Sequence, residues 1–130
     1  MTEPHAPRIM LIEDNPDHAF YIEKGLSRRG FEIEWFSEGA SALARAREKP
    51  PDAILLDVML PGMHGLEILR ELKGDGRTLA VPVIVVTAYA TLQLHREKEM
   101  ALVYGAADFF KKPFKVDELA TVLRKILKLI

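Results

Sequence analysis

Residues 8–17 read Arg-Ile-Met-Leu-Ile-Glu-Asp-Asn-Pro-Asp, an apolar run that ends on two adjacent acids and a proline. The run is long enough for a buried strand, and Pro16 is favourable at the start of a helix that would follow it. Three later apolar runs also end on polar side chains, namely Asp57, Thr87 and Lys112. Because the carboxyl ends of parallel strands open on one edge of a sheet, we expect these three side chains and the two acids to share one small site.

Short apolar runs alternate with amphipathic stretches along the whole chain. The pattern predicts strands at residues 8–12, 31–36, 53–57, 83–87 and 108–111, and helices at 16–30, 40–48, 66–73, 92–104 and 116–130. This alternation is typical of an α/β fold with a parallel sheet covered by helices on both faces. The polar and apolar alternation of residues 31–36 indicates an edge strand. We expect one domain at residues 8–130, after a flexible tail at residues 1–7.

The composition agrees with a single domain and excludes several classes of protein. With 130 residues, 48% of them hydrophobic, the chain can bury one core but not two ordinary ones. A formal charge of -1 gives no general attraction for nucleic acid or anionic membranes. The apolar runs are too short to span a bilayer, the N-terminus lacks the core of a signal peptide, and cysteine is absent. We therefore expect a cytoplasmic protein that contacts neither membrane nor nucleic acid directly.

The polar residues at the strand ends predict phosphate chemistry around a metal ion. Glu13, Asp14 and Asp57 would repel one another, so a compensating cation is needed. Oxygen ligands without histidine or cysteine suit Mg²⁺, with Mn²⁺ as the second candidate. Asp57 is the candidate nucleophile because carboxylates can form acyl phosphates, and Lys112 and Thr87 would stabilise the transferred group.

Four motifs occur in order along the chain, namely Ile-Glu-Asp-Asn-Pro (12–16), Leu-Leu-Asp-Val-Met-Leu-Pro-Gly-Met-His-Gly (55–65), Val-Thr-Ala (86–88) and Gly-Ala-Ala-Asp-Phe-Phe-Lys-Lys-Pro-Phe (105–114). Together they resemble the receiver domain of two-component response regulators, from about Arg8 to the C-terminus. The resemblance implies a flavodoxin-like (βα)5 three-layer sandwich with a parallel five-stranded sheet in the order 2-1-3-4-5.

The resemblance also implies a role for each site residue. Asp57 matches the position phosphorylated by a histidine kinase, Asp14 the one that binds Mg²⁺ directly, and Glu13 the one that reaches the metal mainly through water. The backbone carbonyl of Met59 would complete the metal shell. Met59 and Tyr89 also occupy positions that flank the phosphoryl group in the family, and we hypothesise that both lengthen its lifetime.

The resemblance further implies a switch. Thr87 and Lys112 match the switch hydroxyl and the phosphate-binding lysine, and Phe109 matches the aromatic that changes rotamer on activation. Phe109 lacks a hydroxyl, so its switching would depend on packing alone. Phosphorylation of Asp57 would alter the face formed by the predicted elements at 92–104, 108–111 and 116–130. Such a domain is a signalling switch that assists its own phosphorylation and dephosphorylation, rather than an enzyme.

The implied partners are a sensor histidine kinase or phosphotransfer protein, a downstream protein, and a second copy of the chain in a phosphorylation-linked homodimer. A free-standing receiver is favoured because the last helix is predicted to run to the end of the chain. The alternatives are a receiver fragment of a longer DNA-binding regulator or hybrid kinase, and a pseudo-receiver that is not phosphorylated. Three other classes are disfavoured, namely a P-loop nucleotidase, a flavin carrier and a phosphatase of the haloacid dehalogenase type. Each class requires a particular sequence pattern after the first strand, and this chain does not have it.

Simpler interpretations fit each residue taken alone. Glu13 and Asp14 could end a strand and cap a helix, and Asp57 could cap a loop. Thr87 is ordinary strand composition, and Phe109 would usually be core. Lys111 and Lys112 compete for one inner position, for which strand alternation and the following proline favour Lys112. These simpler interpretations would require suitable polar side chains to occur by chance at four separate strand ends. One shared site explains all of them together.

Overall fold

The structure is a computed structural model that describes residues 5–60, 62–88 and 91–129. The chain alternates strands and helices in the order β1 (Arg8–Ile12), α1 (Pro16–Ser27), β2 (Glu32–Phe36), α2 (Gly39–Glu48), β3 (Ala53–Asp57), α3 (Gly65–Lys73), β4 (Val83–Thr87), α4 (Thr91–Val103), β5 (Asp108–Lys111) and α5 (Val116–Ile126). The predicted α/β class is confirmed. Four of the five predicted strands have the bounds that the sequence indicated, and β2 is one residue shorter.

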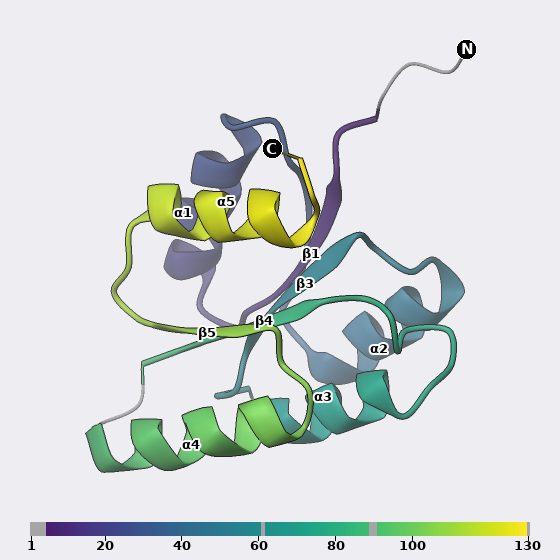
Figure 1. Cartoon of the computed structure of the whole chain (residues 1–130), viewed down its shortest axis with the longest axis vertical. Helices are drawn as coiled ribbons and strands as arrows, with labels where there is room; N and C mark the ends of the chain where they lie inside the picture. Colours follow the sequence, from purple (N-terminus) through teal and green to yellow (C-terminus); the bar gives the residue numbers. More distant parts are fainter. Residues whose placement is uncertain (1–4, 61, 89–90, 130) are drawn as a thin grey trace.

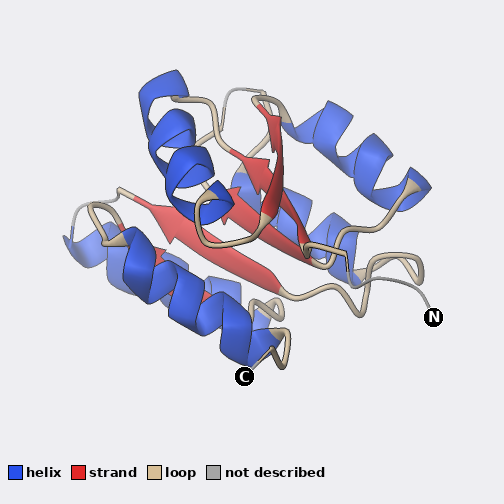
Figure 2. Cartoon of the chain, turned by 90° about the horizontal axis from the view of Figure 1, so that it is seen from above, coloured by secondary structure: helices blue, strands red, loops and turns tan. Residues whose placement is uncertain are grey.

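The five strands form one parallel sheet in the order β2-β1-β3-β4-β5, which confirms the flavodoxin-like order. β2 lies at one edge, as its alternating sequence predicted. Strands β3 and β4 are buried along their whole length, because helices cover both of their faces (Figure 2). The pairing of Ile12 with Leu56 and of Asp57 with Val86 brings the carboxyl ends of β1, β3 and β4 together.

The helices form two layers on opposite faces of the sheet. Helices α1 and α5 cover one face, and α2, α3 and α4 cover the other (Figure 1). Each layer encloses a hydrophobic cluster with alternate residues of the central strands, such as Leu55 on the α1 side and Leu56 on the α3 side. Full burial of a leucine or isoleucine side chain contributes about 1.5–3 kcal/mol. The two clusters therefore hold the strand ends in a fixed relative position.

Two helix starts lie next to the carboxyl edge of the sheet. The side chain of Asn15 caps α1 by accepting hydrogen bonds from the backbone N–H groups of Asp17 and His18. Helix α3 begins at Gly65, whose backbone N–H donates to the carbonyl of Val58 at 2.9 Å. A Cβ atom at Gly65 would lie 2.2 Å from the Cα atom of Val58. Only glycine permits this close approach of α3 to the end of β3.

Two predicted helix ends need correction. The first helix was predicted to reach residue 30 but ends at Ser27, and the last was predicted to reach residue 130 but ends at Ile126. In α5 the backbone N–H of Leu129 donates to Arg124 and that of Lys128 donates to Lys125, with Lys128 at φ 57°. This is a Schellman termination, which usually uses glycine. The correction also removes the pattern on which the preference for a free-standing receiver rested.

The fourth helix ends at Val103, within one residue of its predicted end, and Gly105 terminates it as the sequence predicted. Gly105, at φ 100°, donates its backbone N–H to Leu102, and Ala106 donates to Ala101. This termination leads the chain directly into β5. None of the helices in the described ranges has the length and apolar character needed to cross a membrane.

Candidate functional site

The three predicted acids meet at the carboxyl edge of the sheet. Glu13 follows β1, Asp14 precedes α1, and Asp57 is the last residue of β3. One carboxylate oxygen from each lies within 4.8 Å of the other two. Glu13 is fully buried and Asp57 is 3% exposed, whereas Asp14 is open to solvent. The prediction that these three acids lie close together is therefore correct.

Lys112 joins two of these acids. Its Nζ atom lies 2.5 Å from Oε1 of Glu13 and 2.8 Å from Oδ2 of Asp57. Its backbone N–H also donates to the carbonyl of Thr87 at 2.7 Å, which ties the end of β5 to the end of β4. The neighbouring Lys111 is exposed. The choice of Lys112 over Lys111 for the inner position is confirmed.

Burial governs the electrostatics of Asp57. Desolvation raises the pKa of the Asp57 carboxyl, and the charge of Glu13 adds to this effect. Hydrogen bonds from Lys112 and from the backbone N–H of Met59, at 2.9 Å, oppose the rise without cancelling it. Desolvation would lower the pKa of Lys112, but its hydrogen bonds to Asp57 and Glu13 outweigh that effect and raise it. The folded protein therefore holds the Asp57 carboxylate less favourably than water does.

Thr87 carries a hydroxyl that is fully buried. It is the last residue of β4, between β3 and β5, and its Oγ1 atom has no hydrogen-bond partner among the described residues. A buried hydroxyl without a partner costs free energy and calls for an explanation. One explanation is that a ligand at this edge of the sheet supplies the missing partner.

Of the other predicted site residues, Met59 and Phe109 lie in the described part of the chain. Met59 follows Asp57 by two residues, and its side chain is 53% exposed. Phe109, in the middle of β5, is half-buried against the hydrophobic cluster on the α3 side. Tyr89 lies outside the described residues. Rotamer change at Phe109 and metal binding at the Met59 carbonyl remain predictions.

Two residues that the sequence did not single out hold Glu13 in place. The Nδ1 atom of His18 lies 2.9 Å from Oε1 of Glu13, and the indole Nε1 of Trp35 donates to the Glu13 carbonyl at 2.6 Å. The backbone N–H of Asn15 donates to Oε2 at 3.1 Å. His18 follows Glu13 by five residues and Glu13 precedes α1, so no helical spacing in the sequence indicates this contact. The contact of Trp35 comes from β2 and had no local signal.

The donor set fits Mg²⁺. The three acids offer hard oxygen ligands, and no histidine or cysteine belongs to the described cluster. A divalent cation together with the Lys112 ammonium would balance the three carboxylates. The unpartnered hydroxyl of Thr87 is also accounted for if a phosphoryl group joins the metal at this edge.

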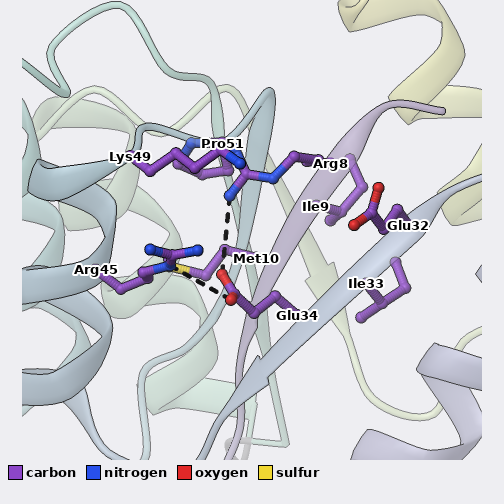
Figure 3. A pocket seen from close by; sticks show the side chains of 9 residues that line it. All are labelled: Arg8, Ile9, Met10, Glu32, Ile33, Glu34, Arg45, Lys49 and Pro51. Atoms are coloured by element: carbon purple, nitrogen blue, oxygen red, sulfur yellow. Dashed lines mark ion pairs between the residues drawn. The ribbon is translucent and has the colours of Figure 1, made fainter. Parts of the chain in front are cut away.

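A pocket of about 220 Å³ lies at the opposite, amino-terminal ends of β1 and β2 (Figure 3). Glu34 stands between two arginines there, with Arg45 at 3.4 Å and Arg8 at 3.9 Å. These ion pairs are partly exposed and contribute little free energy. Because it lies at the amino-terminal ends of the strands, the pocket is separate from the acidic site at their carboxyl ends.

Comparison with known proteins assigns the family. The family model of the response regulator receiver domain matches residues 9–124 of the sequence. The chain belongs to the response regulator receiver family. Receiver domains are signalling domains rather than ordinary enzymes, and they interact with histidine kinases and downstream targets.

Curated relatives include two regulators of about twice the length. The chain is 38% identical over 121 residues to the transcriptional regulatory protein QseB of Escherichia coli O157:H7, covering 93% of this chain and 53% of the relative. It is 33% identical over 122 residues to the DNA-binding dual master transcriptional regulator RpaA of Synechocystis, covering 94% and 49%. The chain thus spans about half the length of these relatives. Their names do not support the expectation that nucleic acid is absent from the function.

Solved receiver domains share the fold closely. One is the receiver domain of a sensor histidine kinase from Pseudomonas aeruginosa PAO1, with a TM-score of 0.85, 35% identity, and coverage of 95% of this chain and 98% of that one. That structure has a magnesium ion coordinated in its active site cleft. Another is the receiver domain of a histidine kinase from Syntrophus aciditrophicus, with a TM-score of 0.85, 31% identity, and coverage of 96% and 92%. Receiver domains bind Mg²⁺ at an acidic pocket of the kind formed here by Glu13, Asp14 and Asp57.

Proposed function

We propose that this chain is a phosphoacceptor switch, in which Asp57 receives a phosphoryl group from the phosphohistidine of a sensor kinase or phosphotransfer protein. The observation that carries the proposal is the bridge of Lys112 between Glu13 and Asp57. An ammonium in this position can follow the phosphoryl group when it arrives, because it already contacts one carboxylate oxygen of Asp57. We further propose that the domain comprises residues 8–130 and acts in the cytoplasm.

In the proposed phosphoryl transfer, one O–P bond replaces one N–P bond. The Asp57 carboxylate attacks phosphorus, the new O–P bond forms as the N–P bond of phosphohistidine breaks, and the leaving imidazole nitrogen keeps the electron pair. Mg²⁺, or Mn²⁺ in its place, would neutralise charge between the carboxylates and the phosphoryl oxygens when bound. Glu13, Asp14, Asp57 and the carbonyl of Met59 are the groups that would hold it.

Lys112 and Thr87 then stabilise the product. Lys112 donates to one phosphoryl oxygen, and the hydroxyl of Thr87 donates to another and gains the partner that it lacks. Movement of Thr87 toward the phosphoryl group frees space next to β5, into which Phe109 can turn. The face formed by α4, β5 and α5 changes as a result, and we propose that this face binds the downstream protein, including a second copy of the chain.

Phosphorylation by a small donor tests the proposal. Incubation with acetyl phosphate and Mg²⁺ should add the mass of one phosphoryl group to the intact wild-type protein. Asp57→Asn should remain unlabelled, and chelation of the metal should abolish labelling. Asp52→Asn is a matched control, because Asp52 lies just before the same strand at its opposite end. Labelling of the Asp57→Asn variant would contradict the assignment.

A second candidate is a receiver that forms part of a longer regulator. This candidate is favoured because the chain matches only about half of QseB and of RpaA, and both relatives are named as transcriptional regulators. DNA binding would then belong to a further domain controlled by this one. A pseudo-receiver is disfavoured because every residue type that phosphorylation requires is present. Sequencing of the full reading frame would decide between the free-standing and the longer protein.

A further inference from the structure

Glu13 is the most completely held side chain at the site. It is fully buried, and its carboxylate accepts hydrogen bonds from Lys112, from the backbone of Asn15 and from the ring of His18. The contacts of Lys112 and Asn15 are explained by the proposed function and by the start of α1. The contact of His18 is not explained by either.

The geometry defines which ring nitrogen of His18 carries the hydrogen. A carboxylate can only accept, so Nδ1 of His18 must donate to Oε1 of Glu13 across the 2.9 Å that separate them. The imidazole side chain is only 20% exposed, which shields this hydrogen bond from competing water.

Aromatic neighbours fix the orientation of the His18 ring. Phe114 packs edge-on against it, with ring centroids 5.6 Å apart and an interplanar angle of 79°. Tyr21 lies on the same helix at 6.1 Å, and its hydroxyl donates to the carbonyl of Phe114 at 3.1 Å. Because Phe114 is in the loop after Lys112, the ring is held between α1 and the loop that carries the phosphate-binding lysine.

Lys112 and His18 share one oxygen of Glu13 but differ in what else they must do. Lys112 also contacts Asp57, and in the proposed function it turns toward the phosphoryl group. Glu13 would then lose its strongest donor at the moment when its orientation toward the metal matters most. His18 has no second acceptor at the acidic cluster among the described residues, so it can stay on Glu13 throughout the transfer.

We propose that His18 is a positioning residue, which holds the Glu13 carboxylate in the orientation that the metal site requires. This inference rests on the proposed function. Some side chains do not bind a metal but hydrogen-bond to its ligands and so orient them. Removal of such a side chain commonly weakens metal binding by about 10-fold to 100-fold. The resemblance to the family implies that Glu13 reaches the metal mainly through water, so we expect the lower end of that range.

Two substitutions separate the hydrogen bond from the packing. His18→Asn keeps an N–H donor close to the position of Nδ1 but removes the ring, and His18→Phe keeps a ring against Phe114 but removes the donor. Trp35 provides the readout, because it is the only tryptophan and its indole contacts Glu13. Mg²⁺ is titrated without any phosphate donor while the fluorescence of Trp35 is followed, and urea unfolding in chelator reports stability separately.

The proposal predicts that His18→Phe binds Mg²⁺ about tenfold more weakly than wild type, and that His18→Asn stays within about twofold of it. Wild-type affinity in His18→Phe, or an equal loss in both variants, would overturn the proposal. If the wild type is labelled at Asp57 in either of those cases, the proposed function stands without this inference. Failure of the wild type to bind Mg²⁺ would overturn both.

Discussion

The Nζ atom of Lys112 lies 2.8 Å from Oδ2 of Asp57, although 55 positions separate the two residues in the chain. Their strands are not adjacent either, because β4 lies between β3 and β5. Lys112 therefore reaches past the end of β4, where Thr87 is buried, to contact the acid of β3. Together with the backbone hydrogen bond from Lys112 to Thr87, the contact ties the ends of β3, β4 and β5 together.

Removal of the charge of Asp57 should stabilise the protein. Burial raises the pKa of this carboxyl, which means that the folded protein holds the charged form less favourably than the unfolded chain does. Asp57→Asn should therefore raise the free energy of unfolding at neutral pH, by on the order of 1 kcal/mol, or a few degrees in Tm. Urea unfolding without Mg²⁺ measures the effect, with Asp52→Asn as the control that should not show it.

The same effect should depend on pH with a defined sign. A carboxyl with a raised folded-state pKa costs stability above that pKa, and the cost disappears below the pKa of the unfolded state. The stability difference between wild type and Asp57→Asn should thus shrink as the pH falls through this range. A difference that grew on acidification would show that Asp57 is stabilised as an anion, contrary to the direction of its pKa.

Loss of Lys112 should destabilise the protein. Lys112→Met would leave two buried carboxylates without their shared cation, which costs roughly 3 kcal/mol for a buried ion pair that loses one partner. Addition of Mg²⁺ should restore part of that loss, since the metal supplies positive charge at the same acids. Lys111→Met, on the exposed neighbour, should change the free energy of unfolding by less than about 0.5 kcal/mol. Equal effects of the two substitutions would argue against the bridge.

Thr87→Val should separate folding from switching. The hydroxyl of Thr87 is buried without a partner in the described structure, so an apolar side chain of the same shape should leave stability unchanged or raise it by about 1 kcal/mol. The variant should still be phosphorylated but should lose the conformational response, which the fluorescence of Trp35 or a change in protease sensitivity of α4 can report. A clear loss of stability would mean that Thr87 does have a hidden partner.

Met59→Asn should shorten the lifetime of the phosphoryl group. The side chain of Met59 is 53% exposed next to Asp57, where it can obstruct an attacking water molecule. Removal of acetyl phosphate followed by timed mass measurement gives the rate of hydrolysis, which we expect to rise several-fold. Leu79→Asn is a suitable control, since Leu79 is 56% exposed and precedes the opposite end of β4. An unchanged rate would remove Met59 from this role.

Most of the fold was predictable because local pattern and tertiary burial agree. The strands at residues 53–57 and 83–87 are continuous apolar runs with proline or charge next to them, and both ends were predicted correctly. The end of α5 was not predictable, because Lys128 adopts the conformation that glycine usually takes there. A sequence pattern indicates a helix end through glycine or proline and gives no signal for a lysine in that position.

The composition of the acidic cluster was predictable from the sheet, but its supporting contacts were not. Parallel strands place Glu13, Asp57 and Lys112 at one edge, so sequence order alone brings them together. The contacts of His18 and Trp35 with Glu13 depend on how α1 and β2 approach that edge in space. No local pattern encodes these distances.

Localisation of the phosphoryl group tests the central claim most directly. Reduction of an acyl phosphate with borohydride converts the modified aspartate into homoserine, which peptide mapping by mass spectrometry can place in the sequence. After treatment with acetyl phosphate and Mg²⁺, we predict homoserine at position 57 and none at positions 14 or 52. Homoserine elsewhere, or none at all in protein shown to be folded and loaded with Mg²⁺, would contradict the account.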